Sequence, residues 1–373
     1  MLIATLNMKG RSARSTSTND PISKWSDVHR TLRQQRIGIL CLQETHLEAH
    51  HTTTIENLYG KRLSIHNSQN PTNPGASAGV AFVINKESVR SHDTTITELI
   101  PGRALLLTLK WHNEYKLMIL NIYAPNAHHE HPDFWRKIKQ KLTDLGNHSI
   151  DIMLGDFNIV EDQFNRSPPR PDDYTATEAL RNFKEQFQII DVWRHDNPNM
   201  RSFTFISNTH SMSRLDRIYT NCTISKSTYN WNITDTIIPS DHRMVLTRIV
   251  PPKTPYIGPG RWTLPLALLT NESFLDNVTE LGIILQNQLT QPHEEPKEPQ
   301  RLWSMFKKEI SEIAERTAKR QLAKMNNKII ALKQDIRELE QNNELDTNEN
   351  QQSNVALLQH EIRHLENKKN KNM

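Results

Sequence analysis

The first 250 residues carry short apolar runs that are separated by polar segments and turn residues. Most of these runs are apolar over their whole length rather than alternating, which is typical of strands buried on both faces of a sheet. The strands predicted in this way are MLIATLN (1–7), IGILCL (37–42), GVAFVI (79–84), ALLLTL (104–109), YKLMILNIY (115–123), IDIMLG (150–155), SFTFI (202–206) and MVLTRIV (244–250).

Three segments between these runs have the spacing of amphipathic helices. Residues 20–35 open with an Asp-Pro start signal, and residues 133–146 end at a glycine. Residues 175–190 begin with Thr175 three positions before Glu178, which is the spacing of a capping box. Strands with helices between them predict an α/β fold. We expect a four-layer α/β sandwich in which two mixed β-sheets are flanked by helices.

The pattern changes twice beyond residue 250. Residues 251–300 are proline-rich at both ends, around one short helical piece, and are typical of a linker. Residues 301–373 are charged and helical, with apolar positions at alternating spacings of three and four. The predicted organisation is therefore one domain at 1–250, a proline-rich linker at 251–300 and a helical segment at 301–373.

The apolar positions of the last segment form two groups of heptads. They lie at Met325, Ile329, Leu332, Ile336 and Leu339, and again at Val355, Leu358, Ile362 and Leu365. Such heptads predict a coiled coil or an antiparallel helical hairpin, through which the chain could self-associate. A helical segment that packs on a further domain is an equally open interpretation.

Composition narrows the class of protein. The chain has 373 residues, a formal net charge of +4 and two cysteines. A diffuse positive charge suits a nucleic-acid partner without requiring one. Two cysteines are typical of reduced thiols, no run approaches the ~18 apolar residues of a membrane span, and no signal peptide opens the chain. We therefore expect an intracellular soluble protein with no membrane partner.

Polar side chains lie at the ends of six of the apolar or β-rich stretches, where the predicted strands begin or end. Each residue alone has an ordinary explanation: Gly-Asp-Phe-Asn at 155–158, for example, is a reasonable turn. Together they predict a functional edge, because functional residues collect on the loops at one edge of a rigid sheet. These residues are Asn7, Glu44, Tyr123, Asn126, Asp156, Asn158, Asp216, Ser240, Asp241 and His242.

These residue types favour one kind of chemistry. Carboxylate and amide oxygens without a cysteine cluster suit Mg²⁺, with Mn²⁺ as the alternative ion, rather than zinc. A histidine oriented by a buried carboxylate can accept a proton or, when charged, stabilise a phosphoryl oxygen. Together they are the components of metal-assisted hydrolysis of a phosphate ester.

The ordered set Asn7, QET (43–45), NIYAPN (121–126), GDFN (155–158), SRLD (213–216) and SDH (240–242) resembles the endonuclease/exonuclease/phosphatase superfamily, which includes deoxyribonuclease I. The resemblance spans about residues 1–250. Within the superfamily the chain is most similar to the endonuclease domain of LINE-type (non-LTR) retrotransposons, through TLNMKGR (5–11), LCLQETHL (40–47), LNIYAPN (120–126) and MLGDFN (153–158).

The resemblance implies a role for each residue of the catalytic set. Glu44 would be the principal Mg²⁺ ligand and Asn7 the second metal residue, with Asp241 near the metal or its waters. Asp156 would position or deprotonate the attacking water, and Asn158 would hold this water or the phosphate.

The remaining predicted roles concern the phosphate and the DNA. His242, oriented by Asp216, would contact the scissile phosphate, and Tyr123 would donate to one of its oxygens. Asn126, Thr204, Ser207, Arg103 and Ser240 are the predicted substrate-binding or loop-holding residues. One position departs from the superfamily pattern: Lys9 stands where many members carry an acid, and its charge could weaken metal binding.

The resemblance thus predicts a metal-dependent endonuclease that acts on double-stranded DNA in the nucleus and leaves a 3′-hydroxyl nick. In the parent element this end would prime reverse transcription. No Asp-Asp pair of a reverse transcriptase occurs after residue 250, so the expected chain is a fragment, a degenerate copy or a gene built from one. Two alternatives stay open: an inactive remnant that binds nucleic acid or self-associates, and another phosphodiesterase or phosphatase of the superfamily.

Overall fold

The computed structural model describes residues 1–12, 22–111, 115–146, 149–250, 264–290 and 298–371. The described residues divide into two compact units. The first unit contains residues 1–254 and 336–359, and the second contains residues 255–335 and 360–373.

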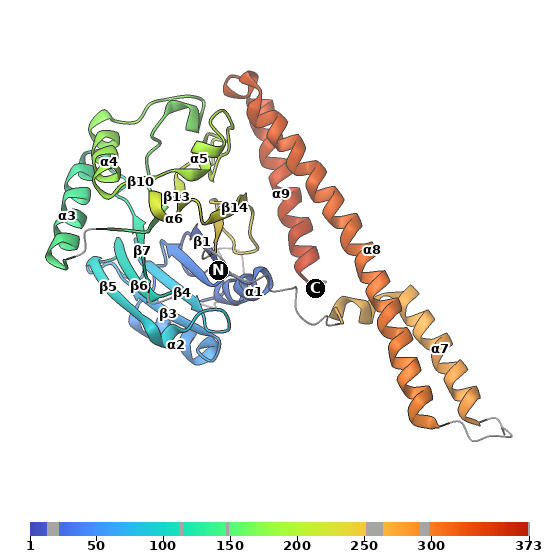
Figure 1. Ribbon diagram of the computed structural model, residues 1–373. Coiled ribbons are helices and arrows are strands. Elements are labelled where there is room, and N and C mark those ends of the chain that lie inside the picture. Colours follow the sequence, from blue (N-terminus) through green and yellow to red (C-terminus); the bar gives the residue numbers. More distant parts are fainter. Residues whose placement is uncertain (13–21, 112–114, 147–148, 251–263, 291–297, 372–373) are drawn as a thin grey trace. The chain divides into compact units, whose positions relative to one another are not determined.

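Two six-stranded sheets form the centre of the first unit (Figure 1). In strand order, the first sheet consists of β14 (Thr228–Thr234), β15 (Met244–Ile249), β1 (Leu2–Asn7), β2 (Ile39–Gln43), β4 (Val80–Asn85) and β3 (Leu63–Ser68). The second consists of β10 (Ile189–Ile190), β13 (Asp216–Asn221), β8 (Ile152–Asp156), β7 (Lys116–Tyr123), β6 (Ala104–Lys110) and β5 (Thr94–Ile100). Both sheets are mixed, because β1 pairs with β2 and β7 with β8 in parallel while the other pairs are antiparallel.

Shorter elements complete this unit. A small third sheet joins β11 (Phe205–Ile206), β12 (Met212–Ser213) and β9 (Arg166–Ser167). The α-helices before residue 254 are α1 (Trp25–Gln35), α2 (Ala49–Tyr59), α3 (His131–Asp144), α4 (Tyr174–Phe187), α5 (Val192–Asp196) and α6 (Cys222–Ser225). The 3-10 turns are η1 (Ser91–Asp93), η2 (His128–Glu130) and η3 (Gln163–Asn165).

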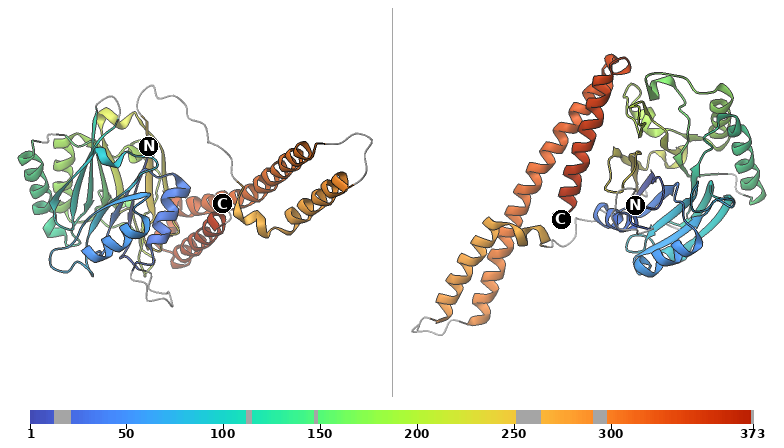
Figure 2. Two further views of the ribbon diagram at one scale, coloured as in Figure 1. Left: turned by 90° about the horizontal axis from the view of Figure 1, so that it is seen from below. Right: turned by 180° about the vertical axis from the view of Figure 1, so that it is seen from behind.

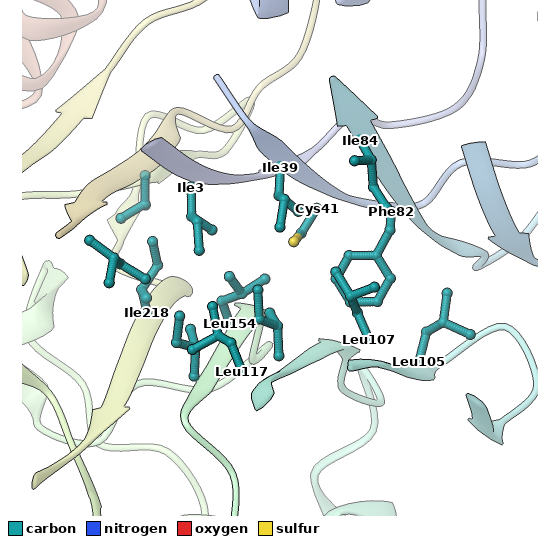
Figure 3. Packing of buried hydrophobic residues seen from close by; sticks show 14 of the residues in the cluster. Ile3, Ile39, Cys41, Phe82, Ile84, Leu105, Leu107, Leu117, Leu154 and Ile218 are labelled. Carbon is teal, nitrogen blue, oxygen red and sulfur yellow. The ribbon is translucent and has the colours of Figure 1, made fainter. Parts of the chain in front are cut away.

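Three layers of buried apolar side chains hold the sheets and helices together. The central layer lies between the two sheets, where residues such as Ile39 and Phe82 face Leu107 and Leu154 (Figure 3). The second layer packs α1 and α2 on the first sheet, and the third packs α3 and α4 on the second sheet (Figure 2). Helix, sheet, sheet and helix thus form the four layers of the α/β sandwich that the sequence predicts.

A buried amide also joins the two sheets. Asn121 of β7 donates through Nδ2 to the carbonyl oxygens of Leu42 (3.2 Å) and Ala81 (3.0 Å) in the opposite sheet. Its Oδ1 accepts a hydrogen bond from Gln43 Nε2 at 2.7 Å. Polar groups buried with all their partners satisfied fix one arrangement of their elements, so this residue sets how β7 lies against β2 and β4.

The elements differ from the sequence predictions in detail. The strand predicted at 202–206 is regular only in β11; the hydroxyl of Thr204, just before it, accepts hydrogen bonds from the backbone amides of residues 215 and 216. Helix α4 is capped by Asp173, which accepts from the Thr175 and Ala176 amides, so the predicted capping box at Thr175 is wrong. The Asp-Pro start at residues 20–21 and most of the proline-rich stretches lie outside the described residues.

The C-terminal part is helical, as predicted. It contains η4 (Leu266–Thr270), α7 (Glu272–Thr290), α8 (Pro299–Gln341), η5 (Asn343–Asp346) and α9 (Glu349–Lys371). Ion pairs from Lys328 to Glu361 (2.7 Å) and from Lys333 to Glu366 (2.8 Å) link α8 and α9 into a helical hairpin. None of the described helices is long and apolar enough to cross a membrane.

Residues 336–359 belong to the first unit and are tied to it by buried polar contacts. Arg201 donates to both carboxylate oxygens of Asp346, at 2.7 and 3.2 Å, and Ser167 donates to Asp346 at 2.6 Å. The guanidinium of Arg243 lies 3.6 Å from the buried Glu340 carboxylate. This unit is therefore built from two separate segments of the chain.

Candidate active site

The predicted catalytic residues lie at one edge of the two sheets because of strand direction. Asn7 ends β1 and Glu44 directly follows β2, which runs parallel to β1. Tyr123 and Asp156 end the parallel strands β7 and β8 in register with each other. Asp216 and His242 lie at the starts of β13 and β15, which run antiparallel to β8 and β1 and so begin where those strands end.

Backbone conformation marks the same edge. Lys9, Glu44 and Asn158 have φ angles of +49°, +48° and +51°. Left-handed backbone is uncommon for residues with a side chain and often occurs at functional sites, where the surrounding structure holds it in place. These conformations therefore favour a functional role for this edge over an ordinary set of turns.

Asn7 links the two sheets within the site. Its Nδ2 donates to Glu44 Oε1 and to Asp156 Oδ2, both at 2.9 Å. Its Oδ1 accepts from the Lys9 amide at 3.0 Å, which fixes the direction of the side-chain amide. Asn7 thus presents N–H groups to the two carboxylates and holds them at a set separation.

Tyr123, Asn126 and Asn158 form a second group of hydrogen bonds. The Tyr123 hydroxyl has two acceptors within reach of its one O–H, Glu44 Oε1 at 2.9 Å and Asn126 Oδ1 at 3.2 Å. Asn158 donates through Nδ2 to Asn126 Oδ1 at 2.9 Å, and its backbone amide donates to Asp156 Oδ1 at 2.9 Å. This group orients the tyrosine hydroxyl and both carboxylates from the side of the second sheet.

His242 and Asp216 form a buried pair. His242 Nδ1 lies 2.8 Å from Asp216 Oδ2, and the imidazole ring packs against Phe205 with ring centroids 4.8 Å apart. Ser240 holds the loop before β15, because its hydroxyl donates to the Asn7 carbonyl oxygen at 2.6 Å and accepts from the His242 amide at 3.0 Å. The carboxylate therefore orients the ring, leaving Nε2 as the nitrogen that can meet a ligand.

Burial and neighbouring charges shift the pKa values of the histidine, one acid and the tyrosine in the site. Burial disfavours the charged form of His242, but the charge and hydrogen bond of Asp216, with the charges of Asp156 and Asp241, raise its pKa to about 9. Burial and the charge of Asp216 raise the pKa of Asp156 to about 6. Burial, followed by the charges of Glu44 and Asp156, raises the pKa of Tyr123 far above its usual range. At neutral pH the site thus holds a cationic imidazole, an ionised Asp156 and a neutral phenol.

The acids of the site fit a hard divalent cation. Ligand atoms of Asp156, Asp216 and His242 lie within 4.8 Å of one another. Within this cluster, His242 Nδ1 and Asp216 Oδ2 are already bonded to each other. Asp241 Oδ1 is buried without a hydrogen-bond partner among the described residues. On Glu44, the bonds from Asn7 and Tyr123 both end on Oε1, and Oε2 lies 3.9 Å from His46.

Three predicted substrate-binding residues lie outside this hydrogen-bonded group. Thr204 is fully buried, and its hydroxyl accepts from the Leu215 and Asp216 amides, both at 3.0 Å, so it supports the start of β13. Ser207 bonds to Ser211 within the turn between β11 and β12. Arg103 packs its guanidinium 4.8 Å from the centroid of the Tyr123 ring and donates to the Ala124 carbonyl oxygen, which positions that strand end.

Two supporting residues were not predicted from the sequence. Asn121, two positions before Tyr123, is visible only as one amide inside the apolar run LMILNIY. Lys24 is buried in an amphipathic helical pattern, and its Nζ donates to the carbonyl oxygens of Met8 (2.5 Å) and Lys9 (3.1 Å). Both act on the backbone that carries the site.

A groove of about 480 Å³ adjoins this edge of the sheets. Asn158 and Phe205, which belong to or contact the site, form part of its lining, together with the exposed Arg170. Arg166 also lines the groove, but its guanidinium is paired with Asp172 at 2.6 Å. An apolar ring and an exposed arginine in one groove suit a ligand with both apolar and anionic parts.

Comparison with known proteins agrees with this geometry. The model of the Endonuclease/Exonuclease/phosphatase family matches residues 4–242, which include every strand-end residue described above. The chain belongs to this family. Membership in the endonuclease/exonuclease/phosphatase family supports a hydrolytic nuclease or phosphatase, and it confirms the superfamily that the motifs predict.

A transposon-encoded protein is among the relatives of this family member. Over 261 residues the chain is 31% identical to the Transposon TX1 uncharacterized 149 kDa protein of Xenopus laevis. The alignment covers 67% of this chain and 18% of the relative, so the chain spans less than a fifth of that protein's length. This similarity agrees with the predicted retrotransposon branch of the family.

Solved structures of two AP endonucleases share the fold. The AP endonuclease LMAP from Leishmania major superposes with a TM-score of 0.55 at 17% identity, covering 67% of this chain and 88% of that one. An AP endonuclease from Archaeoglobus fulgidus superposes with a TM-score of 0.51 at 17% identity, covering 67% and 99%. At these identities the likeness establishes the common α/β sandwich alone.

Proposed function

We propose that the chain is a divalent-metal-dependent DNA endonuclease, which hydrolyses one phosphodiester of double-stranded DNA and leaves a 3′-hydroxyl nick. The observation that carries the proposal is the hydrogen-bonded series from Glu44 through Asn7 to Asp156, beside the buried His242–Asp216 pair. The family and the transposon-encoded relative support DNA as the substrate. A nuclear location would give the enzyme access to chromosomal DNA.

The metal-holding residues are Glu44 and Asp241 in this proposal. Asn7 keeps Glu44 in place through Nδ2, so it acts as a positioning residue for the metal site. Mg²⁺, or Mn²⁺ in its place, would supply positive charge that neutralises the phosphate and eases departure of the 3′ oxygen.

Asp156 is the proposed base for the attacking water. Its pKa, raised to about 6 by burial and the charge of Asp216, is close enough to neutrality for it to accept a proton at physiological pH. The Asn158 amide and Asn7 Nδ2 donate to opposite oxygens of this carboxylate and keep it oriented. Water held by Asp156 and Asn158 would then attack phosphorus opposite the leaving 3′ oxygen.

The phosphate oxygens would meet two donors. His242, cationic below its pKa of about 9, would donate from Nε2 to a non-bridging oxygen while Asp216 holds Nδ1. Tyr123, whose raised pKa keeps it a neutral donor, would turn its one O–H from Glu44 to a second phosphate oxygen. Donors fixed before the substrate arrives stabilise charge as it develops in the transition state. The adjoining groove with Arg170 and Phe205 would receive the neighbouring nucleotides.

Nicking of supercoiled plasmid by the full chain tests the proposal. We expect open circles with Mg²⁺ or Mn²⁺ and none with EDTA, and a loss of about 10²–10³-fold in His242→Gln and in Glu44→Gln, as for removal of a transition-state contact. His195→Gln and Glu185→Gln, at exposed positions of the same unit, should nick at the wild-type rate. Extension of the nicks by a DNA polymerase without prior end repair would identify the 3′-hydroxyl.

Three results would decide against this proposal. A folded protein that binds DNA without nicking it in either metal would be the inactive remnant. Release of terminal phosphate without nicking would make it a phosphatase of the same family. Nicking that persists in His242→Gln would place the active site elsewhere.

A further inference from the structure

Lys9 occupies an unusual place for a cation, beside the carboxylates that would hold the metal. Its ammonium forms an ion pair with Asp241 Oδ2, while the other oxygen of Asp241 is buried without a hydrogen-bond partner among the described residues. The Lys9 amide donates to Asn7 Oδ1, and the next amide, of Gly10, donates to the Glu44 carbonyl oxygen at 2.7 Å. Lys9 is therefore joined directly to Asn7 and Asp241, and the residue after it is joined to Glu44.

The backbone around Lys9 is fixed independently of its side chain. Residue 9 adopts left-handed backbone, and its carbonyl oxygen accepts a hydrogen bond from the buried Lys24 ammonium at 3.1 Å. The side chain of Lys9 is 44% exposed and that of Asp241 is 23% exposed. The ammonium can thus be removed by substitution while the strand end and its hydrogen bonds remain.

We propose that Lys9 is a built-in cation that competes with the divalent metal for Asp241 and so sets a weak metal affinity. The inference rests on the proposed function, because it takes Glu44 and Asp241 as the metal-holding residues. With the ammonium on Oδ2, Asp241 offers less negative charge to a metal. The metal must also approach a fixed positive charge, and like charges a few ångströms apart repel even in water.

The arrangement has a consequence for the metal-free protein. A cluster of carboxylates without a counter-ion is costly when it is partly buried. Lys9 compensates one of these charges, so the site keeps its geometry without metal. Substrate phosphate, which is negative, would offset the charge of Lys9 and make metal binding stronger when DNA is present.

Mn²⁺ binding to the full chain, followed by the electron paramagnetic resonance of the free ion, tests the competition without requiring activity. We expect Lys9→Gln to lower the Mn²⁺ dissociation constant by about tenfold, as expected for removing one unit charge near a divalent ion. Lys9→Arg retains the charge and should bind like the wild type. In an Asp241→Asn background, Lys9→Gln should change the affinity by much less, because the carboxylate for which the ions compete is absent.

The outcomes separate this inference from the proposed function. If Lys9→Gln and the wild type bind Mn²⁺ equally while Glu44→Gln loses binding, the metal site stands and the competition is refuted. A tenfold gain that persists unchanged in the Asp241→Asn background would also refute it, since Lys9 would act without Asp241. If neither the wild type nor Lys9→Gln binds Mn²⁺, either alone or with double-stranded DNA added, then the metal site itself, and with it the proposed function, fails.

Discussion

The hydrogen bond between His242 Nδ1 and Asp216 Oδ2 fixes both the orientation and the charge of the imidazole. Burial alone would keep this ring neutral at physiological pH, because a buried charge is poorly solvated. The carboxylates of Asp216, Asp156 and Asp241 reverse that effect and raise the pKa of His242 to about 9. The charge of the His242 imidazole therefore depends on Asp216, which lies 26 residues earlier in the chain.

This pair predicts the alkaline limb of the pH profile. Nicking that needs ionised Asp156 and the imidazolium should be constant between the Asp156 pKa of about 6 and the His242 pKa of about 9, and should fall as the pH rises through about 9, where His242 loses its proton. In Asp216→Asn the largest cause that raises the pKa is gone while burial remains, so the limb should move to lower pH by at least ~1 unit. The pH dependence of kcat/KM measures this shift.

The control for this experiment is Asp196→Asn, at an exposed position of α5. This variant should keep the wild-type limb. A limb that does not move in Asp216→Asn would mean that the group titrating near pH 9 is not His242.

At the scale of elements, the strands that could be predicted are those buried on both faces. Strands β1, β2, β4, β6, β7, β8 and β15 are continuously apolar or nearly so, and all were predicted. Strands β3, β5 and β14 carry many polar side chains and are partly exposed, as in TTITELI at 94–100. Whether such a segment forms a strand depends on its pairing with a neighbouring strand, and a single sequence does not contain that information.

The active site could also be predicted only in part, namely where its residues lie next to apolar runs in the sequence. The residues that follow apolar runs are local features, so Glu44 and Asp156 are visible in the sequence. Asn7 and Asp156 are 149 positions apart, and their 2.9 Å hydrogen bond depends on how the two sheets pack. The ion pair between Lys9 and Asp241, 232 positions apart, is likewise a product of the fold.

Gly155 shows how closely β7 and β8 must approach to place Asp156. Its φ is +140°, and a Cβ atom at this position would lie 1.9 Å from the Ile122 carbonyl oxygen of β7. We expect Gly155→Ala to lower the free energy of unfolding by at least ~3 kcal/mol, because backbone of a central strand must shift. The same shift would displace Asp156 and abolish nicking. Urea unfolding followed by circular dichroism measures the stability.

Gly146→Ala is the matched control for this substitution. Gly146 also has a left-handed φ, of +69°, but no atom lies within 4 Å of the position a Cβ would take. Gly146→Ala should therefore lower the free energy of unfolding by only ~1–2 kcal/mol, which is the cost of left-handed backbone for a residue with a side chain. Equal losses in the two variants would mean that conformation, and not contact with β7, makes glycine necessary at position 155.

At the scale of the whole molecule, the unit that carries the site is built from distant parts of the chain. Residues 336–359 belong to it together with residues 1–254. The segment from Arg201 to Leu215 contains Thr204 and Phe205. The Thr204 hydroxyl accepts a hydrogen bond from the Asp216 amide, and the Phe205 ring packs on His242. Contacts made by Arg201 at the start of this segment should therefore affect both folding and catalysis.

Asp346→Asn tests that dependence. Arg201 is only 5% exposed, and two of its guanidinium hydrogen bonds, at 2.7 and 3.2 Å, end on the Asp346 carboxylate, while a third ends on the Arg166 carbonyl oxygen. Asparagine keeps the shape but leaves the buried guanidinium without its counter-charge. We expect the free energy of unfolding to fall by about 2 kcal/mol, and nicking to fall with it. Glu349→Gln, at an exposed position of the same segment, should cost less than ~0.5 kcal/mol. Wild-type stability in Asp346→Asn would mean that the contact between Arg201 and Asp346 contributes nothing to the fold around the active site.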